Sequence, residues 1–206
     1  MNIFKQAKKF VEREVLISLL TKAENKEILS QKKFASNIGI AVGLVNVYIK
    51  RCIKKGWIKI TNVPNRRYVY YLTPKGFEEK SRLVCNYLKD SFNFLDNSKK
   101  DFLRLFEICK KKFKKIAIVG NGDLVEVALI VAKASNIKVD IIYSDEIKRK
   151  EILEVPVTNS IRKLSNVDAI IVAEYNDAQR LIDFLQRKIP KKKFLYPSFL
   201  SSLKNK

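Results

Sequence analysis

The chain has 206 residues, of which 47% are hydrophobic and 31% are charged, a composition typical of one or two globular domains. It contains no histidine, which excludes imidazole bases, histidine-containing catalytic triads and histidine zinc sites. The three cysteines, Cys52, Cys85 and Cys109, form no C-x-x-C pair, so we expect neither a disulfide framework nor a metal site. No window reaches the roughly 18 apolar residues of a membrane helix, and we expect a cytoplasmic protein without a membrane partner.

Basic side chains concentrate in the first part of the chain. The formal net charge is +21. Residues 1–115 hold 27 basic and 10 acidic side chains, a net charge of +17, whereas residues 116–206 hold 15 and 11, a net charge of +4. A first half of this charge is typical of a protein that binds a polyanion such as double-stranded DNA. A generally lysine-rich composition is the alternative. It accounts for the high total charge, but less well for the uneven distribution of that charge between the two halves.

Three helices are predicted in the first part. Apolar side chains recur at helical spacing over 10–20. Ser30 is a suitable N-cap for a short helix over 31–38, which Gly39 ends. A third helix is expected over about 42–55, and a glycine follows it. Two short helices joined around a glycine are typical of a helix-turn-helix.

The third helix has two different faces. Its inward stripe is predicted to consist of Val45, Ile49, Cys52 and Ile53. The outward face is apolar at its start and basic at its end, and it consists of Val42, Gly43, Asn46, Val47, Lys50 and Lys54. This order suits the major groove of DNA, where an amide can read an adenine edge, a valine can touch a thymine methyl group and a lysine can meet a phosphate or a guanine. An ordinary solvated helix surface is the alternative for each residue.

A β-hairpin is expected after the third helix. Residues 57–61 alternate between apolar and polar, a Pro-Asn turn signal follows, and residues 68–72 give the returning strand. Arg66 and Arg67 then lie at the hairpin tip, from which they can enter a minor groove or bind phosphates.

The segment from Glu14 to Arg82 resembles the winged-helix domain of MarR-type transcriptional regulators. The resemblance rests on the order of the helices and the hairpin and on two short segments, Lys55-Gly56-Trp57-Ile58 and Leu72-Thr73-Pro74-Lys75-Gly76. It implies that the third helix and the hairpin, or wing, bind double-stranded DNA, usually in a homodimer. Ala41 departs from the family, which often places Ser or Thr there to cap the helix. Winged helices also serve as protein-binding or architectural modules, and that alternative stays open.

The predicted fold is an α+β winged helix-turn-helix DNA-binding domain over 1–90, followed by an α/β Rossmann-like nucleotide-binding domain with a parallel sheet over 115–206. Between them, residues 91–114 are expected to form a helical connector with a break at Asp96–Ser98. The second domain is predicted from short β-branched runs that alternate with helical stretches. These runs are Ile116–Val119, Val139–Tyr143, Val167–Val172 and Phe194–Tyr196.

The first of these runs leads directly into a glycine-containing loop and an apolar helix. Gly120 permits a tight turn, and Gly122 lets the backbone approach a phosphate at the helix N-terminus. Val125 occupies the position of the third glycine of the usual pattern, and Asp123 places a negative charge at the helix start. The candidate cofactor-binding residues are Gly120, Asn121, Gly122, Asp123, Leu124 and Asp145.

Asp145 follows the second of these runs and stands 23 residues after Gly122, close to the roughly 20-residue spacing of a ribose-binding acid. A carboxylate there favours NAD-type over NADP-type ligands. A turn acid that caps the next helix is an equally good interpretation.

Residues 115–197 resemble the nucleotide-binding domain of Rex-type redox-sensing repressors and the N-terminal domain of sugar O-acyltransferases. The shared segments are Ile118-Val119-Gly120-Asn121-Gly122, Val155-Pro156-Val157 and Asp168-Ala169-Ile170-Ile171-Val172-Ala173. The resemblance implies a Rossmann-like fold. NAD and a nucleotide-sugar are candidate cofactors, and the ligand stays unidentified.

We therefore predict a homodimeric DNA-binding transcriptional regulator whose second domain senses a nucleotide-type ligand or mediates dimerisation. We do not expect an enzyme, because histidine is absent and the Tyr-x-x-x-Lys pair Tyr71 and Lys75 flanks a proline in the first domain. An enzyme of nucleotide-sugar or polysaccharide metabolism with a winged-helix appendage is the alternative.

Overall fold

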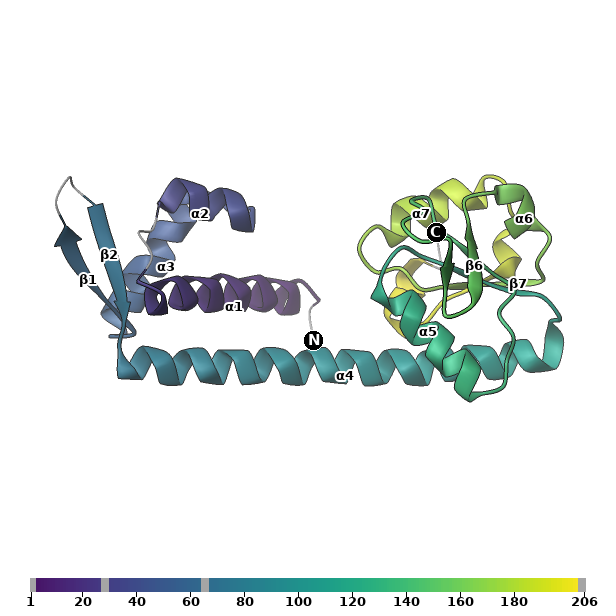
Figure 1. The fold of residues 1–206 in the computed structure, drawn as a ribbon, viewed down its shortest axis with the longest axis horizontal. Coiled ribbons are helices and arrows are strands. Elements are labelled where there is room, and N and C mark those ends of the chain that lie inside the picture. Colours follow the sequence, from purple (N-terminus) through teal and green to yellow (C-terminus); the bar gives the residue numbers. More distant parts are fainter. Residues whose placement is uncertain (1–2, 27–29, 64–66, 204–206) are drawn as a thin grey trace. The chain divides into compact units, whose positions relative to one another are not determined.

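The computed structural model describes residues 3–26, 30–63 and 67–203 (Figure 1). The chain divides into two compact units, Met1–Phe92 and Asn93–Lys206. Within the described ranges, no helix combines the length and the apolar character that a membrane span requires.

The first unit consists of helices and one antiparallel hairpin (Figure 1). In chain order these elements are α1 (Ile3–Glu24), α2 (Gln31–Ile38), α3 (Val42–Lys54), β1 (Ile58–Val63), β2 (Arg67–Leu72) and the beginning of α4 (Pro74–Lys112). Their core is apolar and includes Leu19 and Leu20 of α1, Phe34 of α2 and Val45 of α3. The two short helices and the hairpin predicted from the sequence are therefore present.

The ends of α2 and α3 follow from local sequence chemistry. Ser30 caps α2, since its hydroxyl oxygen accepts the backbone N–H of Lys33 at 3.4 Å. Gly39 ends α2 in the left-handed conformation with φ of 72°, which a residue without a Cβ adopts freely. Ala41 precedes α3 and gives no side-chain cap, because a methyl group has no atom that can accept a hydrogen bond.

The segment that opens α4 joins that helix to the start of β1. The Thr73 hydroxyl donates to the Gly56 carbonyl at 2.6 Å and accepts the backbone N–H of Gly76 at 3.0 Å. A Cβ at Gly76 would lie 1.9 Å from the carbonyl oxygen of Trp57, so only glycine fits there. The segment 72–76 is thus fixed by packing and hydrogen bonding at this junction.

The predicted break at Asp96–Ser98 is wrong, because α4 runs without interruption from Pro74 to Lys112. Neither glycine nor proline occurs within 91–112. Ser98 is fully buried, and its hydroxyl donates to the carbonyl of Phe94 one turn earlier at 2.8 Å, so the buried hydroxyl has a hydrogen-bond partner within the continuous helix.

The second unit is built on a six-stranded sheet in the order β5-β6-β4-β3-β7-β8 (Figure 1). Its strands are β3 (Ile116–Val119), β4 (Ile141–Tyr143), β5 (Glu151–Ile152), β6 (Val155–Thr158), β7 (Ala169–Val172) and β8 (Phe194–Leu195). All neighbouring pairs are parallel except β5 with β6. The helical elements of this unit after α4 are α5 (Asp123–Ala134), α6 (Ile161–Ser165), α7 (Ala178–Gln186) and the 3-10 helices η1 (Lys191–Lys193) and η2 (Ser198–Leu203). The predicted parallel α/β fold is confirmed.

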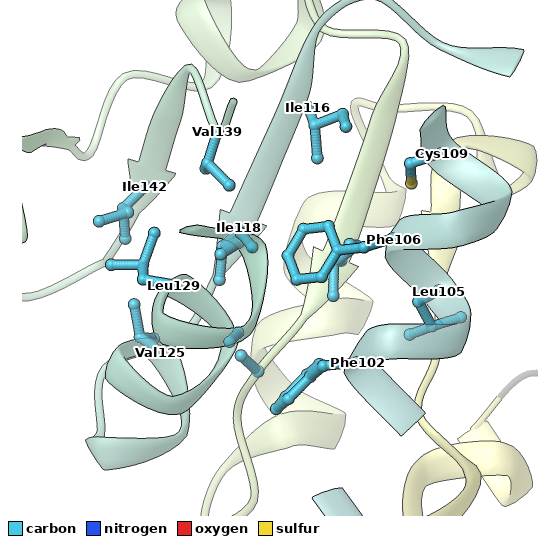
Figure 2. Close-up of a cluster of buried hydrophobic side chains, with 14 of the residues drawn as sticks. Phe102, Leu105, Phe106, Cys109, Ile116, Ile118, Val125, Leu129, Val139 and Ile142 are labelled. Atoms are coloured by element: carbon cyan, nitrogen blue, oxygen red, sulfur yellow. The ribbon is translucent and has the colours of Figure 1, made fainter. Parts of the chain in front are cut away.

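One face of this sheet is covered by α5 and the end of α4. Figure 2 shows Phe106 of α4 beside Ile118 of β3, and Phe102 of α4 and Ile116 of β3 belong to the same buried cluster. Val125 of α5 belongs to the same buried cluster. The second half of α4, expected as a connector, therefore contributes to the core of this unit.

The short β5–β6 hairpin was not predicted. Its turn is formed by Leu153 and Glu154, whose φ angles are 47° and 70°. Two-residue turns with positive φ usually contain asparagine, aspartate or glycine. A Leu-Glu pair therefore gives no turn signal in the sequence.

Asp168 joins the beginning of β7 to the beginning of β3. Its carboxylate accepts the backbone N–H groups of Lys114 and Lys115, both at 2.9 Å. These two hydrogen bonds hold the pKa of the Asp168 carboxyl below its ordinary value of 3.8.

We expect Asp168→Asn to lower the melting temperature at pH 7. Because the folded-state pKa is depressed, the carboxylate stabilises the fold above the unfolded pKa, and this contribution disappears as pH falls through the folded pKa. The difference between the wild type and the variant should therefore shrink from pH 7 to pH 3 in thermal melts. A difference that stays constant over this range would contradict the assignment.

Candidate nucleic-acid interface and ligand-binding loops

Helix α3 presents the predicted outward face to solvent. Val42 is 41% exposed and Val47 is 59% exposed. Lys50 and Lys54 are exposed, and Asn46 is partly exposed. Gly43 is also exposed, and a Cβ placed there would meet no atom within 4 Å. The six outward residues predicted from the sequence thus reach the surface together.

The inward face of α3 is narrower than predicted. Val45, Ile49 and Cys52 are buried in the core of the first unit. Ile53 is 38% exposed, so its prediction as an inward residue is wrong. It lies in the last turn of the helix, beside the stripe that the other three residues share.

Ion pairs divide the basic side chains of the first unit into two groups. Arg51 pairs with Glu12, and Arg13 pairs with Asp90 at 2.6 Å. Within the described residues, Lys50 and Lys54 have no ion pair, so their ammonium groups are available to an external anion.

The hairpin places Arg67 at the first position of β2, opposite Val63. Arg66 lies outside the described residues, and the side chain of Arg67 does as well. The phosphate contacts expected of these two arginines remain a prediction.

In the second unit, the loops that follow β3 and β4 are tied together through Asn121. Its amide group donates to Asp145 Oδ1 at 2.5 Å, and its carbonyl oxygen accepts the Ser144 hydroxyl at 2.6 Å. Arg180 of α7 contacts the other oxygen of Asp145 at 3.3 Å. Asp145 therefore lies beside the glycine-containing loop at the carboxyl end of the sheet, where ligands bind in such folds.

Glu174, which was not predicted, organises the same region from the end of β7. This carboxylate is only 3% exposed. It accepts the backbone N–H groups of Asn121 at 2.9 Å, Tyr175 at 2.8 Å and Asn176 at 3.0 Å. An acid directly after the buried run 169–173 is the signal that could have identified it. The chain's own carboxylate thus occupies the Asn121 N–H that a ligand phosphate would otherwise reach.

A cavity of about 130 Å³ lies between the β3 and β4 loops. Asp123, Glu126 and Glu146 line it together with two cations, and these cations pair with acids: Arg149 with Glu126 at 2.8 Å and Lys148 with Glu146 at 3.4 Å. Small-molecule pockets usually measure about 300 Å³ or more. The described cavity is therefore small and rich in carboxylates.

Other predicted residues of this site have structural roles. The side chain of Leu124 is 3% exposed and packs in the core, so only its backbone can face a ligand. Val125 is also buried in that core. Gly122 precedes α5 in an extended conformation.

Two of the three cysteines lie in the apolar cores, Cys52 in the first unit and Cys109 in the second. Burial raises the pKa of the Cys52 thiol and of the Cys109 thiol, each to about 11. Cys85 is exposed on α4.

Fold and site together define an α/β protein with a parallel sheet, preceded by a helical unit that carries an exposed basic helix face. No protein-family model matches the sequence, and no curated protein matches it significantly.

Solved structures match at low similarity. MepR, a transcription regulator of the Staphylococcus aureus multidrug efflux pump MepA, is 16% identical, with a TM-score of 0.36, 45% of this chain covered and 70% of MepR covered. PigF with SAH is 13% identical, with a TM-score of 0.36, and the match covers 98% of this chain and 81% of PigF. Human N-acetylserotonin methyltransferase in complex with SAM is 11% identical, with a TM-score of 0.33. The match covers 94% of this chain and 78% of the methyltransferase.

The expectation that this chain is not an enzyme is wrong as stated. The solved structures that match nearly the whole chain include a methyltransferase. The lack of histidine therefore does not exclude an enzyme. These TM-scores carry no argument for a particular reaction in this chain.

The two glycines of the loop after β3 provide a matched test of this geometry. A Cβ at Gly120 would lie 2.3 Å from the carbonyl oxygen of Ala173, whereas one at Gly122 would lie 3.8 Å from its nearest neighbour, Tyr175. We expect Gly120→Ala to lower the free energy of unfolding by about 2 kcal/mol, because β7 and the loop must separate. Gly122→Ala should change it by less than about 1 kcal/mol. Urea denaturation of both variants measures this, and equal losses would contradict the close approach.

Proposed function

We propose that this protein is a DNA-binding transcriptional regulator that acts as a homodimer. Its first unit works as a winged helix, with α3 in the major groove and the β1–β2 hairpin as the wing. The second unit senses a nucleotide-type ligand or holds the dimer together.

The observation that carries this proposal is the separation of charges on α3. The inward residues Val45, Ile49 and Cys52 fix the helix in the core, while Asn46, Lys50 and their neighbours face outward. Other cations of this unit are neutralised by acids, as in the Arg51–Glu12 pair. The outward lysines are left for the phosphates of a duplex, whose neutralisation releases counterions and supplies much of the affinity.

The hydrogen-bonded loops of the second unit support a role for that unit in binding or assembly. Asp145 lies where a ribose-binding acid belongs, next to the glycine-containing loop. The surrounding carboxylates and the small cavity favour a ligand that offers hydroxyl groups over one that depends on a diphosphate, since like charges repel. A ligand-free unit that serves only dimerisation is the other possibility within this proposal.

Replacing the outward lysines tests the DNA contact. The affinity of the full chain for duplex DNA should fall as salt rises, and each of Lys50→Ala and Lys54→Ala should reduce the slope of log K against log salt by about one. Lys110→Ala, an exposed position on α4, serves as the matched control and should leave the slope unchanged. Fluorescence anisotropy with a labelled duplex measures these slopes. Equal slopes for all four proteins would remove α3 from the interface.

A ligand screen separates a sensor from a scaffold and from an enzyme. NAD, NADP, CoA, a UDP-sugar, SAM and SAH are each added to the full chain, and the shift in melting temperature is recorded. A sensor is expected to respond to one ligand class, and Asp145→Asn should abolish that response. Turnover of a bound ligand would favour the enzyme alternative, whereas no response to any compound would leave the dimerisation role.

A further inference from the structure

One side of α4 in the first unit is apolar and exposed. Phe77 is 57% exposed, Leu88 is 47% exposed and Phe92 is 62% exposed. Cys85 lies exposed between them. On the inward side of the same helix, Leu83 is buried in the core. Aromatic and aliphatic side chains gathered on one open helix face are typical of an interaction surface.

The spacing of this face is that of a helix–helix seam. The α4 stripe, as we define it, consists of Phe77, Ser81, Val84, Cys85, Leu88 and Phe92. Its members recur at intervals of four and three residues, and they extend over a rise of about 22 Å. A second helix with the same pattern is the partner that such a seam fits.

We propose that the α4 stripe binds the α4 stripe of a second copy of this chain in antiparallel orientation, with the twofold axis between Val84 and Cys85. This inference deepens the proposed homodimer and rests on that part of the proposed function. The register places Phe77 opposite the partner's Phe92, and Ser81 opposite the partner's Leu88. The two large aromatic side chains at the ends of the stripe thereby cover each other.

Two charged residues beside the stripe match each other in this register, while Arg82 on the same side of α4 is paired with Glu79 of its own chain. Glu78 and Lys89 are both exposed and lie on the same flank of α4, since eleven residues complete about three helical turns. An antiparallel twofold axis brings each flank against itself, so Glu78 lies about 3 Å along the helix axis from the partner's Lys89. Two symmetric ion pairs follow.

A parallel pair lacks this match. It would bring Glu78 to the opposite flank of the second helix, where Lys80 is already paired with Glu24 of α1. If the partner were an unrelated protein, nothing would require Phe77 to match Phe92 at the two ends of the stripe, or Glu78 to match Lys89 on its flank. The charges and the aromatic residues therefore both favour a second copy.

The first test measures the dimer in the absence of DNA. Sedimentation equilibrium of the full chain should show a dimer, and the variant Leu88→Glu with Phe92→Glu should raise its dissociation constant at least about 100-fold. Ile130→Glu, at a position on α5 that is 56% exposed, is the control and should have no effect. Undisturbed dimerisation of the stripe variant would overturn this interface and leave the homodimer standing. A monomeric wild type would overturn both the α4 interface and the proposed homodimer. The salt dependence of DNA binding tests the role of α3 independently of either result.

The second test exchanges the charges. Glu78→Lys and Lys89→Glu should each weaken the dimer about tenfold, because each places like charges together. The double variant restores both ion pairs with reversed polarity and should return to the wild-type dissociation constant. Lys100→Glu, an exposed position on the same helix, is the control for net charge. Additive losses in the double variant would overturn the antiparallel register.

Cysteine cross-linking separates the two orientations. In a Cys85→Ser background, Phe77→Cys alone should not form a disulfide dimer, since the two copies of position 77 lie about 22 Å apart along the antiparallel pair. A mixture of Phe77→Cys and Phe92→Cys chains should cross-link. Dimers formed by Phe77→Cys alone would indicate a parallel pair and contradict the proposal.

Discussion

The burial of one stripe of α3 is the constraint on which the first unit depends. Val45 and Cys52 are completely buried, and Ile49 is nearly so. A buried valine or isoleucine side chain stabilises the fold by about 1.5–3 kcal/mol relative to an exposed one. Because this stripe must face the core, the helix cannot rotate, and Asn46, Val47 and Lys50 are held outward. The surface that we assign to DNA is thus a consequence of the packing on the opposite side.

Carboxylates of the chain pair with many of its cations and N–H groups, and only the groups left unpaired can bind an external partner. In the first unit they neutralise the inner cations, such as Arg13 through Asp90. In the second unit the Glu174 carboxylate accepts a hydrogen bond from the backbone N–H of Asn121, and the Asp145 carboxylate accepts one from the side-chain amide of Asn121. The loop after β3 is therefore held by internal hydrogen bonds in the position where a Rossmann-like fold usually binds a phosphate. A ligand at this site competes with, or extends, this network.

Much of this arrangement followed from local sequence signals. The cap at Ser30, the end of the helix at Gly39 and the four-residue strand Ile116–Val119 were all predicted, because caps, glycines and buried β-branched runs act locally. The β5–β6 turn was missed, since leucine and glutamate carry no turn preference there. Glu174 was missed because only the folded sheet brings its carboxylate to Asn121. The predicted break in α4 failed because tertiary burial, as at Ser98, outweighed the weak helix propensity of an Asp-Asn-Ser sequence.

The most direct measurement of the central claim is photo-cross-linking to duplex DNA from α3. A photoreactive amino acid is placed at Val47, which is 59% exposed, or at Ile130 of α5, which is 56% exposed and serves as the matched position. The account predicts efficient cross-links from position 47 that disappear at high salt, and none from position 130. Cross-links from position 130 alone, or from neither position under conditions in which the chain binds duplex DNA, would contradict it.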